Sequence, residues 1–255
     1  MRVTVLGSAA SHAGEGQACA GYLVEAGDTR VLLDCGNGVL SNLYRVVDPY
    51  SLDAVFITHN HPDHYADLYS LHAMLRYAPS GPVSGMRLFT PDGLFDRMQF
   101  LLSERGAADF QEAFEDCELF AGEAVVVGDL TITPHEVDHT PPTFALAVDA
   151  DGSRLVFTAD TAPGDRADAA VAGADLLIAE ATLPERYAGM SPHLTAREAG
   201  ELARTAGAAE LVLTHVWPTN DREAMRADAS ASFDGPVTVA VEFASFEVPV
   251  REGHR

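Results

Sequence analysis

The chain has 255 residues, of which 47% are hydrophobic and 21% charged, a composition typical of globular rather than disordered proteins. Sixteen basic and 38 acidic side chains give a formal net charge of −22, and every basic residue is an arginine. Proteins that bind nucleic acids gather positive charge against the phosphates, so this balance disfavours long RNA or DNA as a partner. The length fits one large α/β domain or two small ones.

The sequence also indicates in which compartment the protein lies and whether it associates with a membrane. No apolar run approaches the roughly 20 residues that a membrane-spanning helix needs, so we expect no membrane partner. The first seven residues are typical of a strand followed by a turn and lack the features of a secretory signal peptide. The three cysteines, Cys19, Cys35 and Cys117, are scattered and odd in number, which favours a cytoplasmic protein without a disulfide framework.

The first 55 residues and the stretch 123–158 are rich in predicted strands, with alternation at 3–5 and 130–133. Short apolar runs that end in a polar residue recur along the chain and are typical of buried strands. In α/β proteins, the sites are built at the carboxyl ends of such strands. The four runs that end in a candidate ligand or acid are 54–59, 155–160, 176–180 and 211–215.

Helices are predicted between these strands, over 62–76, 195–207 and 221–232. Thr195 is a predicted N-cap with Glu198 as its capping-box partner. The stretch 79–122 is predicted to hold one strand and two helices (93–104 and 107–118), as a packing insertion, a lid or a dimerisation element. Two strand-rich halves, each followed by helices, indicate a single domain over 1–255 in which two sheets pack face to face with helices outside.

The main chemical signal is the run His59-Asn60-His61-Pro62-Asp63-His64 at a strand end. His59 and His61 are two residues apart on an extended turn, so both side chains point the same way and can hold one metal ion. Asp63 and His64, on the next turn, can face a second ion. Imidazole and carboxylate ligands without thiolate suit Zn, Mn or Fe rather than a structural cysteine–zinc site.

Four ligands do not fill two metal sites, so the remaining ligands must come from other strand ends. His139, Asp160 and His215 stand at such positions, and a carboxylate such as that of Asp160 can bridge two cations. Each ion then keeps room for a shared water, the open position that catalysis requires. The expected sets are His59, His61, His139 and Asp160 on one ion, and Asp63, His64, Asp160 and His215 on the other.

The His-x-His-x-Asp-His string, with the later His139, Asp160 and His215, resembles the metallo-β-lactamase superfamily over nearly the whole chain. The resemblance implies a four-layer αββα sandwich. Within the superfamily, the segments 6–8, 33–36, 180–182 and 193–195 are similar to the phosphodiesterase branch, which includes ribonuclease Z and class II-like cyclic-nucleotide phosphodiesterases. The C-terminal half from Glu180 is most similar to the atypical class II cyclic-nucleotide phosphodiesterases of actinobacteria. The resemblance also implies a homodimer.

Three features depart from ribonuclease Z. Its His-Glu-Ala-Thr motif reads Ala179-Glu180-Ala181-Thr182 here, so the histidine proposed there as a general acid is missing. The stretch 79–122 is short and has no counterpart of the Gly/Pro-rich arm that clamps tRNA. The net charge is also unsuited to holding tRNA. These departures favour a small phosphodiester over an RNA substrate.

Lesser candidates each have a functional and a structural interpretation. His193 could bind phosphate or protonate the leaving oxygen, or it could be a surface or capping histidine. Glu180 and Asp34 could each orient a ligand histidine, or each could be a buried, hydrogen-bonded acid without such a role. His12, in the glycine-rich loop 8–16, could contact substrate. We interpret His72 as a packing residue, His135 as a non-ligand, and Trp217 as core or as a surface on which a base stacks.

The sequence therefore predicts a hydrolase with two divalent metal ions, zinc before manganese or iron, that acts on a small cyclic nucleotide or similar phosphodiester. A hydroxide shared by the two ions would attack phosphorus, with Asp63 as ligand and base and His193 as a catalytic candidate. The alternatives are a lactone, lactam or thioester as the substrate, or a tRNA 3′-end endonuclease. A scaffold that has lost catalysis would lack a ligand, and none is missing.

Overall fold

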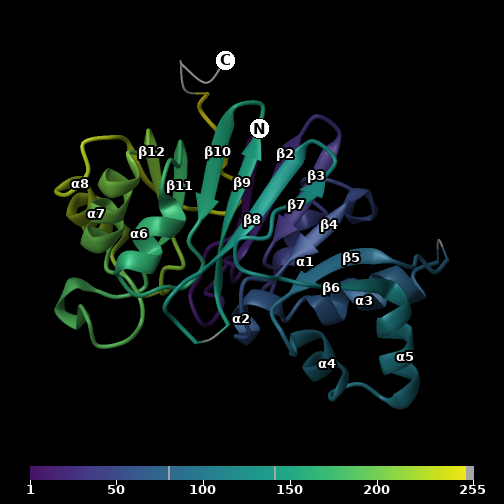
Figure 1. Cartoon of the computed structure of the whole chain (residues 1–255). Helices are drawn as coiled ribbons and strands as arrows, with labels where there is room; N and C mark the ends of the chain where they lie inside the picture. The colour runs from purple at the N-terminus through teal and green to yellow at the C-terminus, as the bar shows by residue number, and fades with distance from the viewer. Residues whose placement is uncertain (80, 141, 251–255) are drawn as a thin grey trace.

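The computed structural model describes residues 1–79, 81–140 and 142–250. Two seven-stranded sheets lie face to face, and helices cover the outer face of each, as Figure 1 shows. Because each sheet is buried on both faces, its strands are apolar on both sides rather than alternating with polar residues. The predicted αββα sandwich is confirmed.

The first sheet has the order β14-β1-β2-β3-β4-β5-β6. Neighbours from β14 to β3 pair antiparallel, and those from β3 to β6 pair parallel. The last strand of the chain therefore lies beside the first, with Val3 opposite Phe246. The strands are β1 (Arg2–Gly7), β2 (Gly21–Ala26), β3 (Thr29–Leu33), β4 (Ala54–Phe56), β5 (Met86–Thr90), β6 (Phe114–Glu118) and β14 (Ser245–Glu247).

The second sheet has the order β13-β12-β11-β10-β9-β8-β7. The pairs from β13 to β10 are parallel and those from β10 to β7 antiparallel, so each sheet has a parallel half that carries strand ends to one edge. The strands are β7 (Val125–Val127), β8 (Leu130–Glu136), β9 (Phe144–Ala150), β10 (Ser153–Phe157), β11 (Leu176–Glu180), β12 (Glu210–Thr214) and β13 (Val237–Val239).

The core is layered in the same way as the sheets. Leu33 and Phe56 pack between the sheets, whereas their neighbours Leu32 and Val55 pack under the helices. Across the gap between the sheets, the rings of Tyr22 and Phe157 lie 4.6 Å apart. Burial of both faces of every central strand holds the two edges of the sandwich in a fixed relation, which a site shared between them requires.

The predicted helices are present, but several of their boundaries differ, and α1 and α6 have no counterpart among the predictions. The helix predicted over 93–104 ends at Gln99, and the next one begins at Glu104. The helix predicted over 62–76 is broken at Ala66 and Asp67, where the Asp67 carboxylate accepts from the backbone N–H groups of Gly38 and Leu40. The helices are α1 (Val39–Leu43), α2 (Pro62–Tyr65), α3 (Leu68–Tyr77), α4 (Leu94–Gln99), α5 (Glu104–Ala113), α6 (Asp165–Val171), α7 (Ala196–Ala206) and α8 (Arg222–Ser230), with 3-10 turns η1 (Pro49–Ser51) and η2 (Glu185–Tyr187).

The stretch 79–122 is part of the first layer rather than a separate body. Its β5 and β6 extend the first sheet, and α4 and α5 pack beside them. The helix predicted over 107–118 is wrong in its second half, because Phe114–Glu118 pairs with β5 as an edge strand. A role for the stretch as a lid or in dimerisation stays a prediction. Among the described residues, no helix is long and apolar enough to cross a membrane.

Candidate metal centre

The predicted ligands meet at one edge of the sandwich, where strands of both sheets end. His59 and His61 lie on the connection from β4 to α2, and α2 itself carries Asp63 and His64. From the second sheet, Asp160 follows β10 and His215 follows β12. The edge is where the parallel halves of the two sheets converge, as the strand-end pattern predicts.

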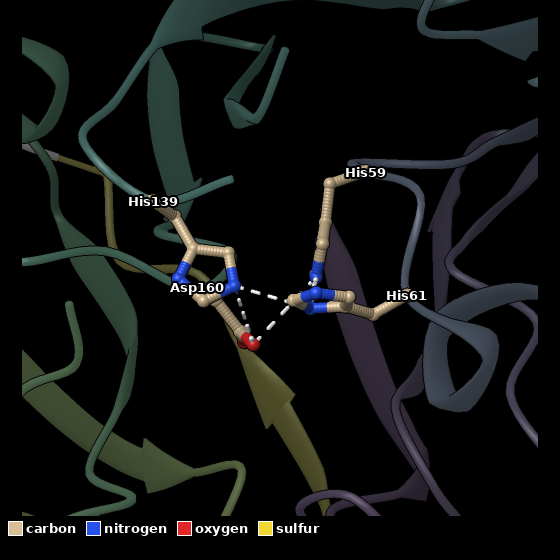
Figure 2. Close-up of side chains that lie close together, drawn as sticks. All are labelled: His59, His61, His139 and Asp160. Atoms are coloured by element: carbon tan, nitrogen blue, oxygen red, sulfur yellow. Dashed lines mark hydrogen bonds and ion pairs between the residues drawn. The ribbon is translucent and has the colours of Figure 1, made fainter. Parts of the chain in front are cut away.

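Four side chains form the first cluster, His59, His61, His139 and Asp160, which Figure 2 shows converging from both sheets. The Nδ1 atom of His61 lies 3.0 Å from His59 Nε2 and 3.1 Å from His139 Nε2. The Asp160 carboxylate approaches the Nε2 atoms of His59 and His139 at 3.6 and 3.7 Å. This is the ligand set that the sequence predicts for the first ion.

Asp63, His64 and His215 form the second cluster. The Nε2 atoms of His64 and His215 lie 3.2 Å apart, and Asp63 Oδ2 is 3.2 Å from His215 Nε2. Asp160 Oδ1 lies 3.5 Å from His64 Nε2 and 3.3 Å from His215 Nδ1. One carboxylate of the second sheet thus stands between the two clusters, in the bridging position that the sequence predicts for it.

The protonation states favour metal binding in the first cluster. Burial lowers the pKa values of His59, His61 and His139, which keeps their nitrogens free to coordinate. Burial alone would raise the pKa of Asp160, but His215 and His64 outweigh it and hold this pKa well below its usual range. In His64 the carboxylates of Asp160 and Asp34 outweigh burial and raise the pKa, so a cation and a proton compete there.

The donor set fits a metal ion. Three imidazole nitrogens within about hydrogen-bond distance of one another cannot all be satisfied by the few protons that neutral rings carry. Asp160 Oδ1 is buried and has no hydrogen-bond partner in the described structure. A cation in the first cluster would satisfy its three nitrogens, and a second cation beside His64 and His215 would satisfy Asp160 Oδ1. Both would have nitrogen and oxygen ligands that suit Zn, Mn or Fe.

A second set of contacts orients the ligands. Asp34 is fully buried and lies with Oδ2 2.6 Å from His64 Nδ1, while it accepts from the backbone N–H and the hydroxyl of Thr58. Asp34 therefore orients a ligand histidine, one of its two predicted roles. The hydroxyl of Thr182 lies 2.8 Å from His215 Nδ1, and His139 Nδ1 donates to the backbone carbonyl of Pro192 at 2.9 Å.

The backbone conformation at three strand ends also orients the side chains of the site. Asp34, Ala159 and His215 each follow a strand and have φ values of 58°, 52° and 49°. The left-handed region is uncommon for residues other than glycine, and such residues concentrate at functional sites. The turn at each strand end directs the side chain of that residue, or of the next one, into the gap between the sheets.

His193 lies beside the clusters and is paired with a buried acid. Its Nδ1 is 2.9 Å from Glu180 Oε1 and 3.9 Å from Asp160 Oδ2. Burial alone would lower the pKa of His193, but the hydrogen bond and charge of Glu180 outweigh it and raise this pKa. Glu180 also accepts from the N–H of Thr161 and the hydroxyl of Thr182. Glu180 thus orients His193 rather than a first-cluster ligand.

The remaining candidates belong to neither cluster of candidate ligands. His72 is buried against Phe110 and Tyr77 in α3, in agreement with a packing role. His135 belongs to no cluster of potential ligands among the described residues. Trp217 is half-buried. His12 is exposed at the mouth of a cavity beside Asp63.

Two contacts were not predicted from the sequence. The backbone N–H of Ser11 donates to Asp63 Oδ2 at 2.7 Å, and the Thr182 hydroxyl joins Glu180 to His215. Neither has a local signal, because a serine in a loop or a threonine after a strand is common. Only the pairing of distant segments brings them to the centre.

Comparison with known proteins agrees with this geometry. Residues 29–216 match a family model described as a β-lactamase superfamily domain. The protein ML1173 of Mycobacterium leprae is 36% identical over 259 residues, covering 99% of this chain and 90% of the relative. Ribonuclease Z of Mycobacterium bovis is 29% identical over 280 residues, covering 98% and 99%.

The chain is also similar to the probable metallo-hydrolase YhfI of Bacillus subtilis, which is 30% identical over 247 residues, with 94% of this chain and 97% of YhfI covered. The crystal structure of YhfI, a metallo-β-lactamase fold protein, superposes with a TM-score of 0.87 over 96% of this chain and 98% of that one. With the family model matched over most of its length, the chain belongs to the β-lactamase superfamily and has the metallo-β-lactamase fold.

Proposed function

We propose that the protein is a phosphodiesterase that uses two divalent metal ions to hydrolyse a small cyclic nucleotide or a similar phosphodiester. The observation that carries the proposal is the His193–Glu180 pair beside two adjoining ligand clusters. An alkoxide leaving group needs a proton, and a histidine kept protonated by a buried carboxylate can supply it. The similarity to a ribonuclease Z, whose name denotes cleavage of an RNA phosphodiester, supports the same bond.

His59, His61, His139 and Asp160 would hold one ion, and Asp63, His64 and His215 the other, with Asp160 shared. Zinc fits these ligands first, and manganese or iron also suit them. When bound, such ions lower the pKa of coordinated water toward neutrality and offset the charge on phosphoryl oxygens. A singly charged diester is attracted to this centre even though the whole chain carries a net charge of −22.

Asp63 is suited to orient the attacking water. Burial alone would raise the pKa of Asp63, but its hydrogen bond with His215 and the charge of His64 hold this pKa well below its usual range. The carboxylate therefore stays ionised and is a weak base, so its work is to fix the direction of the water through a hydrogen bond. Ser11 supports this by donating its backbone N–H to the same carboxylate.

His193 is suited to complete the reaction. Its Nδ1 faces Glu180, which leaves Nε2 as the atom that can donate a proton to the leaving oxygen. In the balanced step, the water oxygen bonds to phosphorus as the bond to the leaving oxygen breaks. The water loses one proton to solvent, and the leaving oxygen gains one from His193.

The test is turnover of a substrate panel by protein loaded with zinc or manganese, with Asp63→Ala as the control. The panel holds 3′,5′-cyclic AMP, 2′,3′-cyclic AMP, an aryl phosphodiester, a precursor tRNA and a simple lactone. Cleavage of the cyclic nucleotide that Asp63→Ala loses would support the proposal. Lactone turnover without diester cleavage would overturn it in favour of the acyl hydrolases suggested by the superfamily, and cleavage of tRNA alone would favour an endonuclease.

A second arm tests the role of His193 through the leaving group. His193→Ala and Glu180→Gln should slow cleavage of a dialkyl or cyclic diester by roughly a hundredfold, the lower end of what general acid catalysis supplies. Cleavage of a p-nitrophenyl diester should change little, because p-nitrophenolate leaves without a proton. Equal losses on both substrates would contradict proton donation.

We also propose that the protein is a homodimer. Size-exclusion chromatography with light scattering would measure its mass in solution, and the mass of a single chain would contradict this proposal.

A further inference from the structure

A shallow cavity of about 380 Å³ borders the metal centre on the side of Asp63. Ser11 and His12 from the loop between β1 and β2 form one wall, and Pro62 and Asp63 from the start of α2 form another. Asn37, after β3, the buried Cys19, and two alanines, Ala13 and Ala66, also line it. Neither His193 nor Asp160 lines this cavity, so the cavity and the proposed proton donor share no wall.

The rim of the cavity is fixed to both sheets. Ala9 pairs with Val216 directly after the ligand His215, and Ala10 N–H donates to the carbonyl of the same valine. Ser11, in the left-handed region with φ 62°, then donates its N–H to Asp63. A group seated in the cavity would thus touch a loop whose position is coupled to the Asp63 carboxylate.

The lining suits an uncharged, hydrogen-bonding group. Asp63 is the only acid in it, and its carboxylate is committed to Ser11 and His215. Burial and the nearby Asp63 raise the pKa of the Cys19 thiol to about 11, so the floor is neutral. His12 and Asn37 are exposed at the mouth and offer a ring face, donors and an acceptor. The volume lies within the range of small-molecule sites.

A second cavity differs in its charge and in its distance from the candidate ligands. It has about 560 Å³, and its charged lining residues are four aspartates and the arginine that pairs with one of them: Asp129, Asp149, Asp151, Asp175 and Arg154. None of the predicted metal ligands lines it. Four carboxylates repel an anionic diester, and the cavity is separate from the chemistry. Volume alone would favour this larger cavity as the substrate site, whereas contact with Asp63 favours the smaller cavity.

We propose that the cavity beside Asp63 binds the nucleoside part of the substrate, which in a linear nucleotide diester is the substituent that stays on phosphorus and in a cyclic nucleotide carries both ester oxygens. This inference rests on the proposed phosphodiesterase function. In an in-line displacement, the attacking and leaving oxygens lie on opposite sides of phosphorus, and the retained substituent projects to the side of that line. The cavity adjoins the centre at Asp63 and is not lined by His193, so the nucleoside can occupy it while the leaving oxygen lies at His193, with the base packed on His12 and bonded to Asn37.

The test compares two diesters that share a leaving group and differ only in the retained group. These are thymidine 5′-(p-nitrophenyl) phosphate and methyl p-nitrophenyl phosphate, hydrolysed by the metal-loaded protein. We expect kcat/KM to favour the thymidine diester by at least about tenfold, the worth of one or two hydrogen bonds with stacking. His12→Ala and Asn37→Ala should reduce that preference toward unity by slowing cleavage of the thymidine diester much more than cleavage of the methyl diester.

Glu15→Ala is the matched control, since Glu15 lies exposed in the same loop and outside the cavity lining. It should keep the full preference. Calorimetric binding of thymidine 5′-phosphate gives a readout that needs no turnover, and its Kd should rise about tenfold in the two cavity variants. Equal cleavage of both diesters, or a preference that both variants retain, would overturn the inference and leave the proposed function standing. If neither diester is cleaved, an unchanged Kd for thymidine 5′-phosphate in both cavity variants overturns the inference, and a lack of cyclic-nucleotide turnover overturns the proposed function.

Discussion

The two sheets supply the centre in different ways. The first sheet contributes His59, His61, Asp63 and His64 from one run of six residues after β4. The second contributes three single residues, from the ends of three separate segments. In a contiguous run, the local backbone fixes how the four side chains lie relative to one another. The relative positions of scattered ligands depend instead on the packing of the whole layer.

This difference indicates which substitutions should disturb metal binding most. Asp160 is the one ligand that approaches both clusters, and it comes from the scattered side. The first sheet supports its ligand His64 with a buried carboxylate, and the second supports His215 with a neutral hydroxyl. Substitutions on either side can therefore show whether the contiguous or the scattered half controls metal binding.

The largest effect is expected from Asp160→Ala. Because this carboxylate stands between the clusters, we expect both metal ions to be lost and hydrolysis to fall by at least about a thousandfold, the upper end for one electrostatic group. His61→Ala removes a ligand of the first cluster only and should spare the second ion. Metal content by plasma mass spectrometry, alongside turnover, checks this. Asp165→Ala, exposed on α6, is the control, and equal metal loss in both ligand variants would contradict a bridging role.

The next largest effect distinguishes the two residues that hold ligand histidines in place, Asp34 behind His64 and Thr182 behind His215. Asp34→Asn should weaken metal binding by roughly ten- to a hundredfold, the usual cost of losing a carboxylate behind a ligand histidine. Thr182→Val should cost less, because a hydroxyl is a weaker partner than a charged group. Competition with a chelator of known affinity measures both. Thr182→Ser, which keeps the hydroxyl, should bind metal like the parent chain, and a larger loss in Thr182→Val than in Asp34→Asn would reverse the ranking.

A smaller effect is expected in the layer behind the second sheet. Thr195 caps α7, with its side chain accepting from Glu198 N–H while Glu198 reaches back to Thr195 N–H. Thr195→Ala should lower the free energy of unfolding by about 1 kcal/mol. Thr195→Ser keeps the acceptor and should lose much less. Urea denaturation of the metal-free variants gives the comparison, and an unchanged midpoint in Thr195→Ala would show that the cap contributes nothing.

The smallest effect concerns the layer behind the first sheet. Burial lowers the pKa of His72, so the folded chain resists a proton that the unfolded chain takes up as the pH falls below about 6.5. Stability contributed by neutral His72 is therefore present at higher pH and lost on acidification. His72→Gln removes this contribution, so the pH dependence of its melting temperature should be weaker than that of the parent chain. Parallel slopes for the two metal-free proteins would contradict the prediction.

The sequence predicted the centre better than its surroundings. The seven candidate ligands that the structure brings together could be named because one run of six residues carries four of them and three later strand ends each carry one. The αββα fold followed from buried strand patterns, and α7 from its capping box. The helix predicted over 107–118 failed at Phe114–Glu118, where two glutamates favour a helix but the segment pairs with β5 as an edge strand. Tertiary pairing outweighed local propensity there.

Contacts between distant segments account for most of what the sequence did not predict. The bond from Ser11 to Asp63 spans 52 residues, and that from Thr182 to His215 spans 33. Neither hydrophobic periodicity nor a helix-capping pattern in the sequence predicts such a pair. The pairing of Glu180 with His193 was equally open, because a buried acid at a strand end has several partners within reach.

The pairing of β14 with β1 has a consequence for how the protein is made. Strand β1 acquires its edge neighbour only when residues 245–247 have been synthesised, 30 positions beyond His215, and the candidate ligands span residues 59–215. Contacts this distant in sequence slow folding and follow loop closure. All the candidate ligands are therefore already synthesised before this edge of the first sheet can close.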